Sequence, residues 1–375
     1  MSEPASPLAD TEIFLAAIPG LEPLLLAEAR SIGFTAATAV PGGVVVPGGR
    51  DAAMRANLWL RGASRVLWRF SSFRALHLAQ LDKRARRVDW ARVLRADVPV
   101  RVDATCRASR IYHAKAAAQR VEQAITDTVG APIAQDAPVR VMVRMDDDLC
   151  TLSIDTSGEL LHRRGHKQAV GKAPLRETMA ALFLRDCGYD GTEPVVDPMC
   201  GSGTFVIEAA EIAAGLAPGR SRAFAFEHLA GHDAEAWAQM CAAAQSKAPQ
   251  ARFFGSDRDQ GAVAMATDNA TRAGVAPFCD FHCQAVSALQ PPPGPPGLVM
   301  VNPPYGERIG ARHMLHAIYG ALGQTLRARF SGWRVGLVTS DSGLAASTGL
   351  PFLPPGPPVP HGGLSVRLYR TAALQ

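Results

Sequence analysis

The strongest constraint on the fold is a short apolar segment that runs into an acid and two closely spaced glycines. Residues 195–204 read VVDPMCGSGT, and another apolar stretch follows directly. This order is typical of a strand, a tight turn at Gly201 and Gly203, and a helix that begins after the turn. The glycines let the backbone approach a ligand closely, beside the free N–H groups of a helix N-terminus. From residue 173 on, helices and strands alternate, which predicts a doubly wound α/β sheet.

The glycine turn disfavours two ligand classes and favours a third. It lacks the G-x-x-x-x-G-K-[ST] spacing of a phosphate-binding loop and the third glycine of a dinucleotide fingerprint. Asp197, which precedes the glycines, repels a phosphate but suits a ligand with a cationic amine, such as the methionine end of S-adenosylmethionine. A lone G-x-G is weak evidence, because an ordinary βα turn can also contain one.

Two further motifs follow in chain order, each at the end of a predicted strand. Residues 253–259 read FFGSDRD and place Asp257 where a ribose diol is commonly held, although a surface turn explains this motif equally well. Residues 298–306 read LVMVNPPYG. Two consecutive prolines stop a central strand and stiffen the chain, so the Asn302 amide and the adjacent carbonyl groups form a fixed set of acceptors for an –NH2 group. Tyr305 offers a ring face to a planar substrate.

Charge is distributed unevenly along the chain. Between Arg55 and Arg120 there are 16 Lys and Arg residues against four Asp residues, a net charge of +12, so the rest of the chain carries −7 of the total of +5. This pattern predicts a module that binds a polyanion such as a nucleic acid, with a merely solvated basic face as the alternative. The densest positions are assigned to RNA contact: Lys83, Arg84, Arg86 and Arg87. The interleaved aromatic residues are expected to pack in the core, with stacking on bases as the alternative: Trp59, Trp68, Phe70, Phe73, Trp90 and Tyr112.

Length and composition set outer limits on the class of protein. The 375 residues suffice for two domains, and a hydrophobic content of 47% is ordinary for a globular chain. No apolar run reaches the roughly 18 residues of a membrane helix. The stretch MSEPASPLADTEIF has acids where a signal peptide needs positive charge. The seven Cys are odd in number and scattered, which favours reduced thiols. We therefore predict a cytoplasmic protein without membrane association.

The order of elements predicts two domains joined by a linker. Residues 1–155 mix helices and strands in an α+β manner, with helices at 20–33 and 114–129 and a β-hairpin over 139–155. Residues 156–172, rich in Arg, His and Gly, are assigned to the linker. Residues 173–375 are assigned to the doubly wound domain, in which about 218–249 is expected to form an insertion over the sheet.

Three longer strings make the motifs specific: LHRRGHKQAVGKAPLRETMAA at 161–181, DPMCGSGTFVIEAA at 197–210 and NPPYGER at 302–308. With them, the chain resembles the THUMP-domain-containing bacterial large-subunit ribosomal RNA guanine-N2 methyltransferases, from Ile13 to about Arg370. The resemblance implies a Rossmann-like methyltransferase domain preceded by a ferredoxin-like region and a THUMP RNA-binding domain. Some members carry a second methyltransferase domain, and we expect none here because the chain ends too early.

The resemblance also implies roles for matching residues. Asp257 would hold the ribose of S-adenosylmethionine, and its methionine part would be lined by Asp197, Pro198, Gly201, Ser202, Gly203 and Thr204. Asn302 would border the cofactor and, with Pro303, Pro304 and Tyr305, hold the guanine. The family usually has an acid near the adenine amino group. Ala285 stands at the matching position here, so Gln284 or a backbone carbonyl is expected to take its part.

On this interpretation, the N2 amine of a flipped guanine donates hydrogen bonds to the Asn302 amide oxygen and the Pro303 carbonyl, which orient its lone pair. Other functions stay open. DNA adenine-N6 and protein glutamine methyltransferases share the N-P-P-Y motif, a transfer RNA guanine-N2 methyltransferase is the nearest rival, and a non-catalytic RNA-binding or assembly factor is a different class. A zinc site at Cys279–Cys283 is disfavoured because a second Cys/His pair of suitable spacing is missing, so no metal is predicted.

Overall fold

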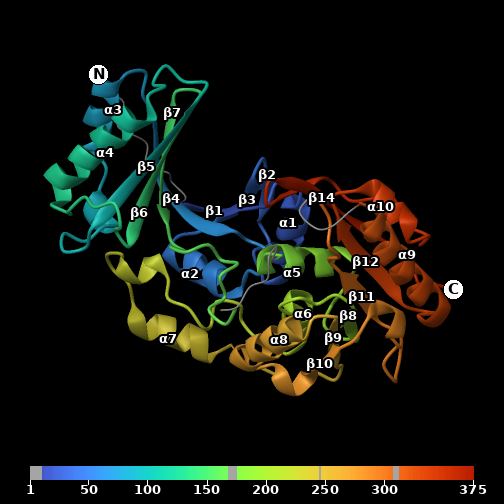
Figure 1. Ribbon diagram of the computed structural model, residues 1–375. Helices are drawn as coiled ribbons and strands as arrows, with labels where there is room; N and C mark the ends of the chain where they lie inside the picture. The colour runs from blue at the N-terminus through green and yellow to red at the C-terminus, as the bar shows by residue number, and fades with distance from the viewer. Residues whose placement is uncertain (1–10, 168–174, 245, 307–311) are drawn as a thin grey trace. The chain divides into compact units, whose positions relative to one another are not determined.

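The computed structural model describes residues 11–167, 175–244, 246–306 and 312–375, which form two compact units (Figure 1). The chain passes between the units after Ala17, Leu25, Leu161, Ser221 and Ala243. The first unit therefore comprises the chain up to Ala17, Leu26–Leu161 and Arg222–Ala243, and the second comprises Ile18–Leu25, His162–Ser221 and Ala244–Gln375. No helix within the described ranges combines the length and apolar character that crossing a bilayer requires.

The first unit is built on a seven-stranded sheet in the order β2-β3-β1-β4-β7-β6-β5. Its strands are β1 (Glu12–Ala16), β2 (Thr38–Val40), β3 (Gly43–Pro47), β4 (Arg65–Arg74), β5 (Val100–Arg107), β6 (Val139–Asp146) and β7 (Leu149–Asp155). The alternating sequence of β6 buries every second side chain: Val139, Val141, Val143 and Met145. Strands β6 and β7 pair antiparallel, so the predicted hairpin is confirmed, and it turns at Asp147 and Asp148 with positive φ.

The helices of the first unit are α2 (Arg50–Trp59), α3 (Leu78–Ala85), α4 (Ala114–Val129) and α7 (Ala234–Ala242), with the 3-10 turns η1 (Trp90–Arg92) and η2 (Ala225–His228), while α1 (Glu22–Ser31) is divided between the units. Helix α2 packs against β4, and α7 contacts α2. Helices α3 and α4 lie side by side, and α4 packs along β5 (Figure 1). Gly130, with a φ of 77°, ends α4 in a left-handed cap.

The aromatic residues of the basic segment divide between the core and the surface. Trp68, Phe73 and Trp90 are buried, as predicted, and Trp59 and Phe70 are half-buried. The prediction was wrong for Tyr112, which is 72% exposed. The neighbouring Ile111 takes the buried position instead, because side chains of successive extended residues point in opposite directions.

The segment 222–243 belongs to the first unit, although it is inserted in the sequence of the second. Arg222 donates hydrogen bonds to the carbonyl oxygens of Ser157 (3.1 Å) and Glu159 (2.8 Å). The ring of Phe226 stacks on Phe224 and meets the ring of Trp237 edge-on. The expectation that this insertion covers the second sheet was therefore wrong, because its aromatic side chains pack with one another and its backbone contacts belong to the first unit.

The second unit contains a seven-stranded sheet in the order β10-β9-β8-β11-β12-β14-β13. The strands are β8 (Val195–Asp197), β9 (Phe253–Asp257), β10 (Cys279–Cys283), β11 (Leu298–Val301), β12 (Arg334–Thr339), β13 (Val359–His361) and β14 (Leu364–Arg370). Strands β8 to β12 pair in parallel, whereas β14 runs antiparallel to β12. This is the predicted α/β sheet with one reversed strand, β14, which lies between β12 and the edge strand β13.

Both faces of this second sheet are buried, which explains why its strands are apolar without interruption. Met300 packs with one cluster that holds side chains of α5 (Glu177–Asp186), α6 (Thr204–Ala213) and α8 (Gln260–Ala273). Val301 packs with the other, which holds side chains of α9 (Arg312–Arg329) and α10 (Ser342–Ser347). Short 3-10 turns, η3 (Ala276–Phe278) and η4 (Val286–Ala288), flank β10. Each fully buried side chain of this size contributes roughly 1.5–3 kcal/mol.

Candidate functional site

The three predicted motifs meet at one edge of the second sheet. Strand β8 lies between β9 and β11 and pairs with both in parallel, so the carboxyl ends of all three strands share an edge. Asp197 ends β8, Asp257 ends β9 and Asn302 directly follows β11. Ligands of open parallel sheets bind at this edge, outside the carboxyl ends of the strands.

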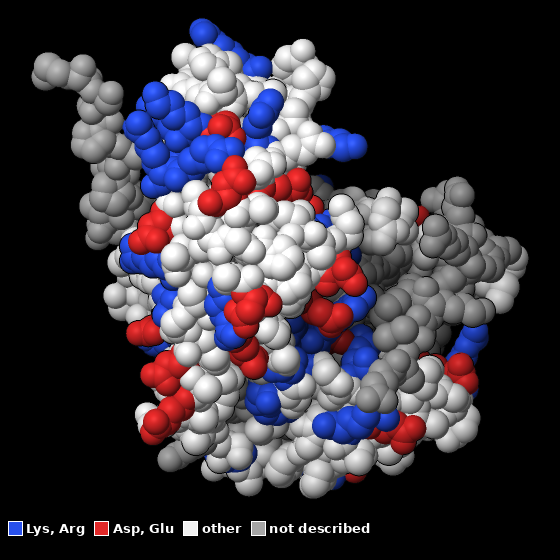
Figure 2. Space-filling view, turned by 90° about the vertical axis from the view of Figure 1, so that its left-hand side faces the viewer, with Lys and Arg blue, Asp and Glu red and all other residues white. Residues whose placement is uncertain are grey.

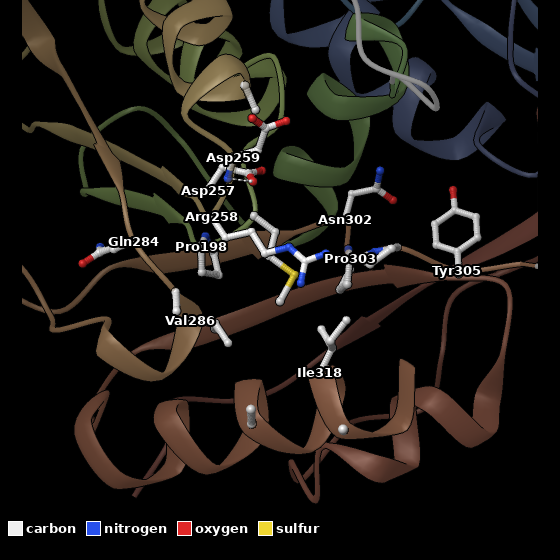
Figure 3. Close-up of a pocket in the computed structure, with 16 residues that line it drawn as sticks. Pro198, Asp257, Arg258, Asp259, Gln284, Val286, Asn302, Pro303, Tyr305 and Ile318 are labelled. Atoms are coloured by element: carbon white, nitrogen blue, oxygen red, sulfur yellow. Dashed lines mark hydrogen bonds between the residues drawn. The ribbon is translucent and has the colours of Figure 1, made fainter. Parts of the chain in front are cut away.

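A cavity of about 620 Å³ lies at this edge. Seven of the predicted site residues line it: Pro198, Asp257, Gln284, Asn302, Pro303, Pro304 and Tyr305. In Figure 3, Asp257 and Asp259 lie on one side, Asn302, Pro303 and Tyr305 on another, and Ile318 of α9 opposite. A cavity of this volume falls within the range of small-molecule sites. Ala285 also lines it, beside Gln284.

The other predicted residues of the glycine turn do not line this cavity: Asp197, Gly201, Ser202, Gly203 and Thr204. Gly201 has a φ of +52°, and a Cβ built there would meet no atom within 4 Å, so the turn faces open space at this point. Gly203 has a φ of +84° and caps α6, and its Cβ would come within 3.1 Å of the Ala266 Cβ. One glycine therefore leaves room over the turn, whereas the other permits close packing of α6 on α8.

Asp197 is a buried carboxylate with unusual electrostatics. Its side chain is 2% exposed, and one oxygen accepts a hydrogen bond from the Met199 N–H at 3.1 Å. The pKa of Asp197 is raised to about 8, chiefly by burial; the hydrogen bond from Met199 opposes this rise, and the nearby charge of Asp257 adds to it. A cationic group bound next to Asp197 would favour its ionised form, so the position suits an amine.

Asp257, in the second motif, is hydrogen-bonded to the glycine turn of the first motif. One carboxylate oxygen accepts from the Gly201 N–H and the other from the Asp259 N–H, both at 3.0 Å. A carboxylate offers about four acceptor positions, so two remain for a ligand. Asp257 lines the cavity (Figure 3) and therefore presents these positions to whatever binds there.

The Asn-Pro-Pro-Tyr turn carries two polar atoms without partners. The Oδ1 atom of Asn302 and the hydroxyl of Tyr305 are both buried, and neither has a hydrogen-bond partner among the described residues. An unpaired buried acceptor costs about 1–3 kcal/mol, so native proteins retain such groups where a ligand satisfies them. Burial raises the pKa of Tyr305 to about 12, so its hydroxyl keeps its proton near neutral pH.

Buried ion pairs connect residues 164 and 167 to helices α5 and α6, next to the glycine turn. Lys167 contacts the Glu177 carboxylate at 3.0 Å and donates to the Thr204 hydroxyl at 2.8 Å. Arg164 pairs with Glu208 of α6, and both side chains are almost completely buried. The predicted linker, 156–172, is therefore divided: residues 156–161 belong to the first unit and His162 to Lys167 pack into the second. Its remaining residues, 168–172, lie outside the described ones. Glu307 and Arg308, which end the third motif, also lie outside them.

The sequence matches two known protein families. Residues 164–349 match the family described as "RMKL-like, methyltransferase domain", and residues 12–67 match the "RlmL ferredoxin-like domain". Residues 164–349 belong to the RMKL-like methyltransferase family. A relative named "Ribosomal RNA large subunit methyltransferase K/L", from Methylococcus capsulatus, is 36% identical over 90% of this chain and 48% of its own length. The chain thus spans about half the length of the curated relatives it matches.

Solved structures resemble this RMKL-like chain over nearly its full length. One is a "predicted N6-adenine-specific DNA methylase" from Listeria monocytogenes, with a TM-score of 0.87, 28% identity, and coverage of 98% of this chain and 97% of that one. Another is SMU.472, "a putative methyltransferase complexed with SAH", with a TM-score of 0.87, 25% identity, and coverage of 98% and 99%.

Sequence reasoning missed part of the cavity of this RMKL-like domain. Arg258 lines it, and Figure 3 shows its side chain directed into the cavity rather than toward Asp257 or Asp259. Helix α9 contributes Ala317, Ile318 and Ala321. The spacing of the two alanines by four residues places them on one helix face, which is the signal that a search for small residues could have used.

The four predicted RNA contacts are not equivalent in the structure. Figure 2 shows Lys and Arg side chains gathered in the upper part of the view, over α3 and α4. Lys83 and Arg87 are exposed and Arg84 is half-buried. Arg86 is instead held by two carboxylates, Asp82 at 3.0 Å and Asp127 at 2.5 Å. The charge of Arg86 is therefore balanced within the protein, which the sequence does not indicate.

Two cysteine-containing segments lie in the second unit, Cys200 in the glycine turn and Cys279–Cys283. Burial raises the pKa of the Cys200 thiol, which disfavours the thiolate that a nucleophile needs. Cys279–Cys283 forms strand β10, and the described part of the chain contains no group of three or more His, Cys, Asp or Glu placed to hold a metal ion.

Proposed function

We propose that this chain methylates the N2 amine of a guanine in large-subunit ribosomal RNA, with S-adenosylmethionine as the methyl donor. The observation that carries the proposal is the buried Oδ1 atom of Asn302, an acceptor that has no partner among the described residues and lies at the wall of a cavity of about 620 Å³. The N–H groups of an exocyclic amine can satisfy such an acceptor. The names of the relatives, which refer to ribosomal RNA of the large subunit, support the choice of substrate.

The residues at the edge of the sheet fit the proposed cofactor. Asp197 suits the amine of its methionine part, Gly201 leaves open space for it, and Asp257 has acceptor positions left for ribose hydroxyls. A similar solved protein contains SAH, the demethylated form of this cofactor, according to its printed description. When bound, S-adenosylmethionine would supply an electrophilic methyl group.

The side chains of the third motif orient the substrate amine. The Asn302 oxygen and the Pro303 carbonyl would each accept one N–H of the guanine amine and so direct its lone pair. The two prolines keep these acceptors in place, so that catalysis comes from positioning and preorganised dipoles. The protonated Tyr305 hydroxyl can donate a hydrogen bond, and its ring offers a stacking face. The methylated amine is acidic, so no strong general base is required.

The first unit would bind the RNA backbone. Two of its exposed cations, Lys83 on α3 and Arg87 just after the end of that helix, are suited to phosphate contact. A ribosomal RNA substrate places the proposed reaction in the cytoplasm. A transfer RNA remains the second candidate substrate, because the contacts to the guanine amine would be the same.

Methyl transfer to purified unmethylated ribosomal RNA and to transfer RNA tests the proposal. The products are digested to nucleosides and separated by mass spectrometry, and nucleosides from a strain that lacks the gene are compared with those of its parent. We expect N2-methylguanosine from ribosomal RNA, which disappears in the deletion strain. N6-methyladenosine as the product, or methylation of transfer RNA alone, would reject the proposed substrate. Absence of any transfer, together with no binding of S-adenosylmethionine by calorimetry, would reject enzymatic function.

A further inference from the structure

The most exposed large hydrophobic side chain in the described part of the chain belongs to Tyr112. It is 72% exposed and lies between β5 and α4 in the first unit. Its ring centroid is 4.1 Å from that of His113, at an interplanar angle of 43°. Such a ring contributes little to the core, because the apolar surface that it leaves in water gives no stabilisation.

A rigid turn displays this ring. The Arg110 N–H donates to the Asp148 carboxylate at 2.7 Å, and the Asp148 N–H donates to the Ser109 hydroxyl at 3.0 Å. These bonds fasten the turn after β5 to the tip of the β6–β7 hairpin. Ile111, directly before Tyr112 in the sequence, is buried and anchors the chain to the core.

The backbone of the turn after β5 and of the β6–β7 hairpin tip is also strained. Ala108, Asp147 and Asp148 have φ values of 44°, 49° and 60°, and within the described ranges they are the non-glycine residues with positive φ. A non-glycine residue in this conformation costs about 1–2 kcal/mol. The three positions belong to the turn and the hairpin tip that hold Tyr112, so its place on the surface is tightly determined.

Exposed cations surround the ring in sequence. Arg107, Arg110 and Lys115 are all exposed, and the contact of Arg110 with Asp148 is long, at 3.9 Å. The other acids of the hairpin tip are engaged, since Asp147 pairs with Arg74 and Asp146 with Arg144. A flat aromatic face beside exposed cations is the combination that binds single-stranded nucleic acid, in which bases stack and phosphates meet positive charge.

We infer that Tyr112 is a stacking platform for an unpaired base of the RNA substrate, with Arg107 and Lys115 in contact with the flanking phosphates. This site rests on the proposed function, since it deepens the RNA contact of the first unit. It is distinct from the basic residues at the end of α3. An unpaired base suits the site because a duplex hides the faces of its bases within the stack.

Binding of a short single-stranded oligoribonucleotide that carries one 2-aminopurine tests the platform. We expect Tyr112→Ala to weaken binding about ten-fold and to abolish the quenching of 2-aminopurine, because stacking on one aromatic ring is worth about 1–3 kcal/mol per base. Tyr112→Trp and Tyr112→Phe should bind within about two-fold of the parent, since both retain a ring. Leu149→Ala, which removes an exposed apolar side chain at the start of β7, next to the hairpin tip that holds this turn, is the matched control and should bind normally.

Salt dependence separates stacking from charge. Tyr112→Ala should leave the slope of log K against log salt unchanged, whereas Lys115→Ala should lower it by about 0.7, the value for one phosphate contact on a single strand. Thermal unfolding checks that each variant is folded. If Tyr112→Ala binds like the parent, or if Tyr112→Phe is as weak as Tyr112→Ala, the platform is wrong and the proposed function survives. If the parent binds the oligonucleotide through Tyr112 but methylates no RNA, the proposed function fails while the platform stands.

Discussion

Replacing Asn302 with alanine separates catalysis from folding in this protein. The Oδ1 atom of Asn302 has no partner among the described residues, so its removal breaks no hydrogen bond there. We therefore expect the free energy of unfolding to change by less than about 1 kcal/mol. In the proposed reaction, the same atom orients the amine of the substrate. Loss of one preorganised group of this kind costs about 10²–10³-fold in rate, or about 2.7–4 kcal/mol.

The assay follows transfer of a tritiated methyl group to unmethylated ribosomal RNA under single-turnover conditions, alongside calorimetry with the cofactor and denaturation by urea. Asn302→Asp retains an acceptor oxygen and should keep more activity than Asn302→Ala. Asn269 is the contrasting position, because this buried residue donates to the Ser202 carbonyl and accepts from Arg272. Asn269→Ala should lower the free energy of unfolding by about 1–3 kcal/mol. Near-normal turnover of Asn302→Ala, with intact cofactor binding, would refute the role of the Asn-Pro-Pro-Tyr turn.

Three further perturbations follow from the charges and packing of the two units. Burial raises the folded-state pKa of Asp197 to about 8, above the roughly 3.9 of an unfolded aspartate, so the folded chain binds the proton more tightly. Its contribution to stability is complete below about pH 4 and is lost as the pH rises toward 8, and urea unfolding across this range should show a steeper loss for the parent than for Asp197→Asn. Gly203→Ala should lower the melting temperature more than Gly201→Ala, because its Cβ meets Ala266 at 3.1 Å, whereas Gly201→Ala should chiefly weaken cofactor binding in calorimetry. Filter binding at several salt concentrations should give a flatter slope for the combined change of Lys83, Arg84 and Arg87 to Ala, by about 0.9 per lost phosphate contact, and an unchanged slope for Arg86→Ala. Equal slopes for the two would move the RNA contact away from α3.

Local sequence patterns predicted the elements that carry the site. The strand β8, the glycine turn and helix α6 follow from an apolar run, two glycines and a second apolar run. The hairpin of β6 and β7 follows from alternation on both sides of Asp146-Asp147-Asp148. These predictions succeed because side-chain periodicity and turn chemistry act between residues that are close in the chain. The common edge of the three motifs follows from the parallel order of their strands.

The tertiary structure decided which residues of each motif face a cavity and which serve as support. Thr204, in the glycine turn, is held by Lys167 and does not line the cavity, whereas Arg258 does. The cavity wall on α9 comes from Ala317 and Ala321, which carry no chemical signal in sequence. Such roles depend on packing between elements that are far apart in the chain. The periodicity of apolar residues along the sequence does not determine this packing.

By itself, then, the amino-acid order determined the parallel α/β sheet, the position of the Asn-Pro-Pro-Tyr turn at a strand end, and the basic character of the first unit. The folded chain alone decided that Arg86 is neutralised by Asp82 and Asp127, that residues 222–243 pack with the first unit, and that Tyr112 lies on the surface. The physical reason is the sequence separation over which the interactions act. Strand, turn and helix preferences are set by neighbours along the chain, whereas ion pairs, insertions and exposure depend on which distant segments meet when the core closes.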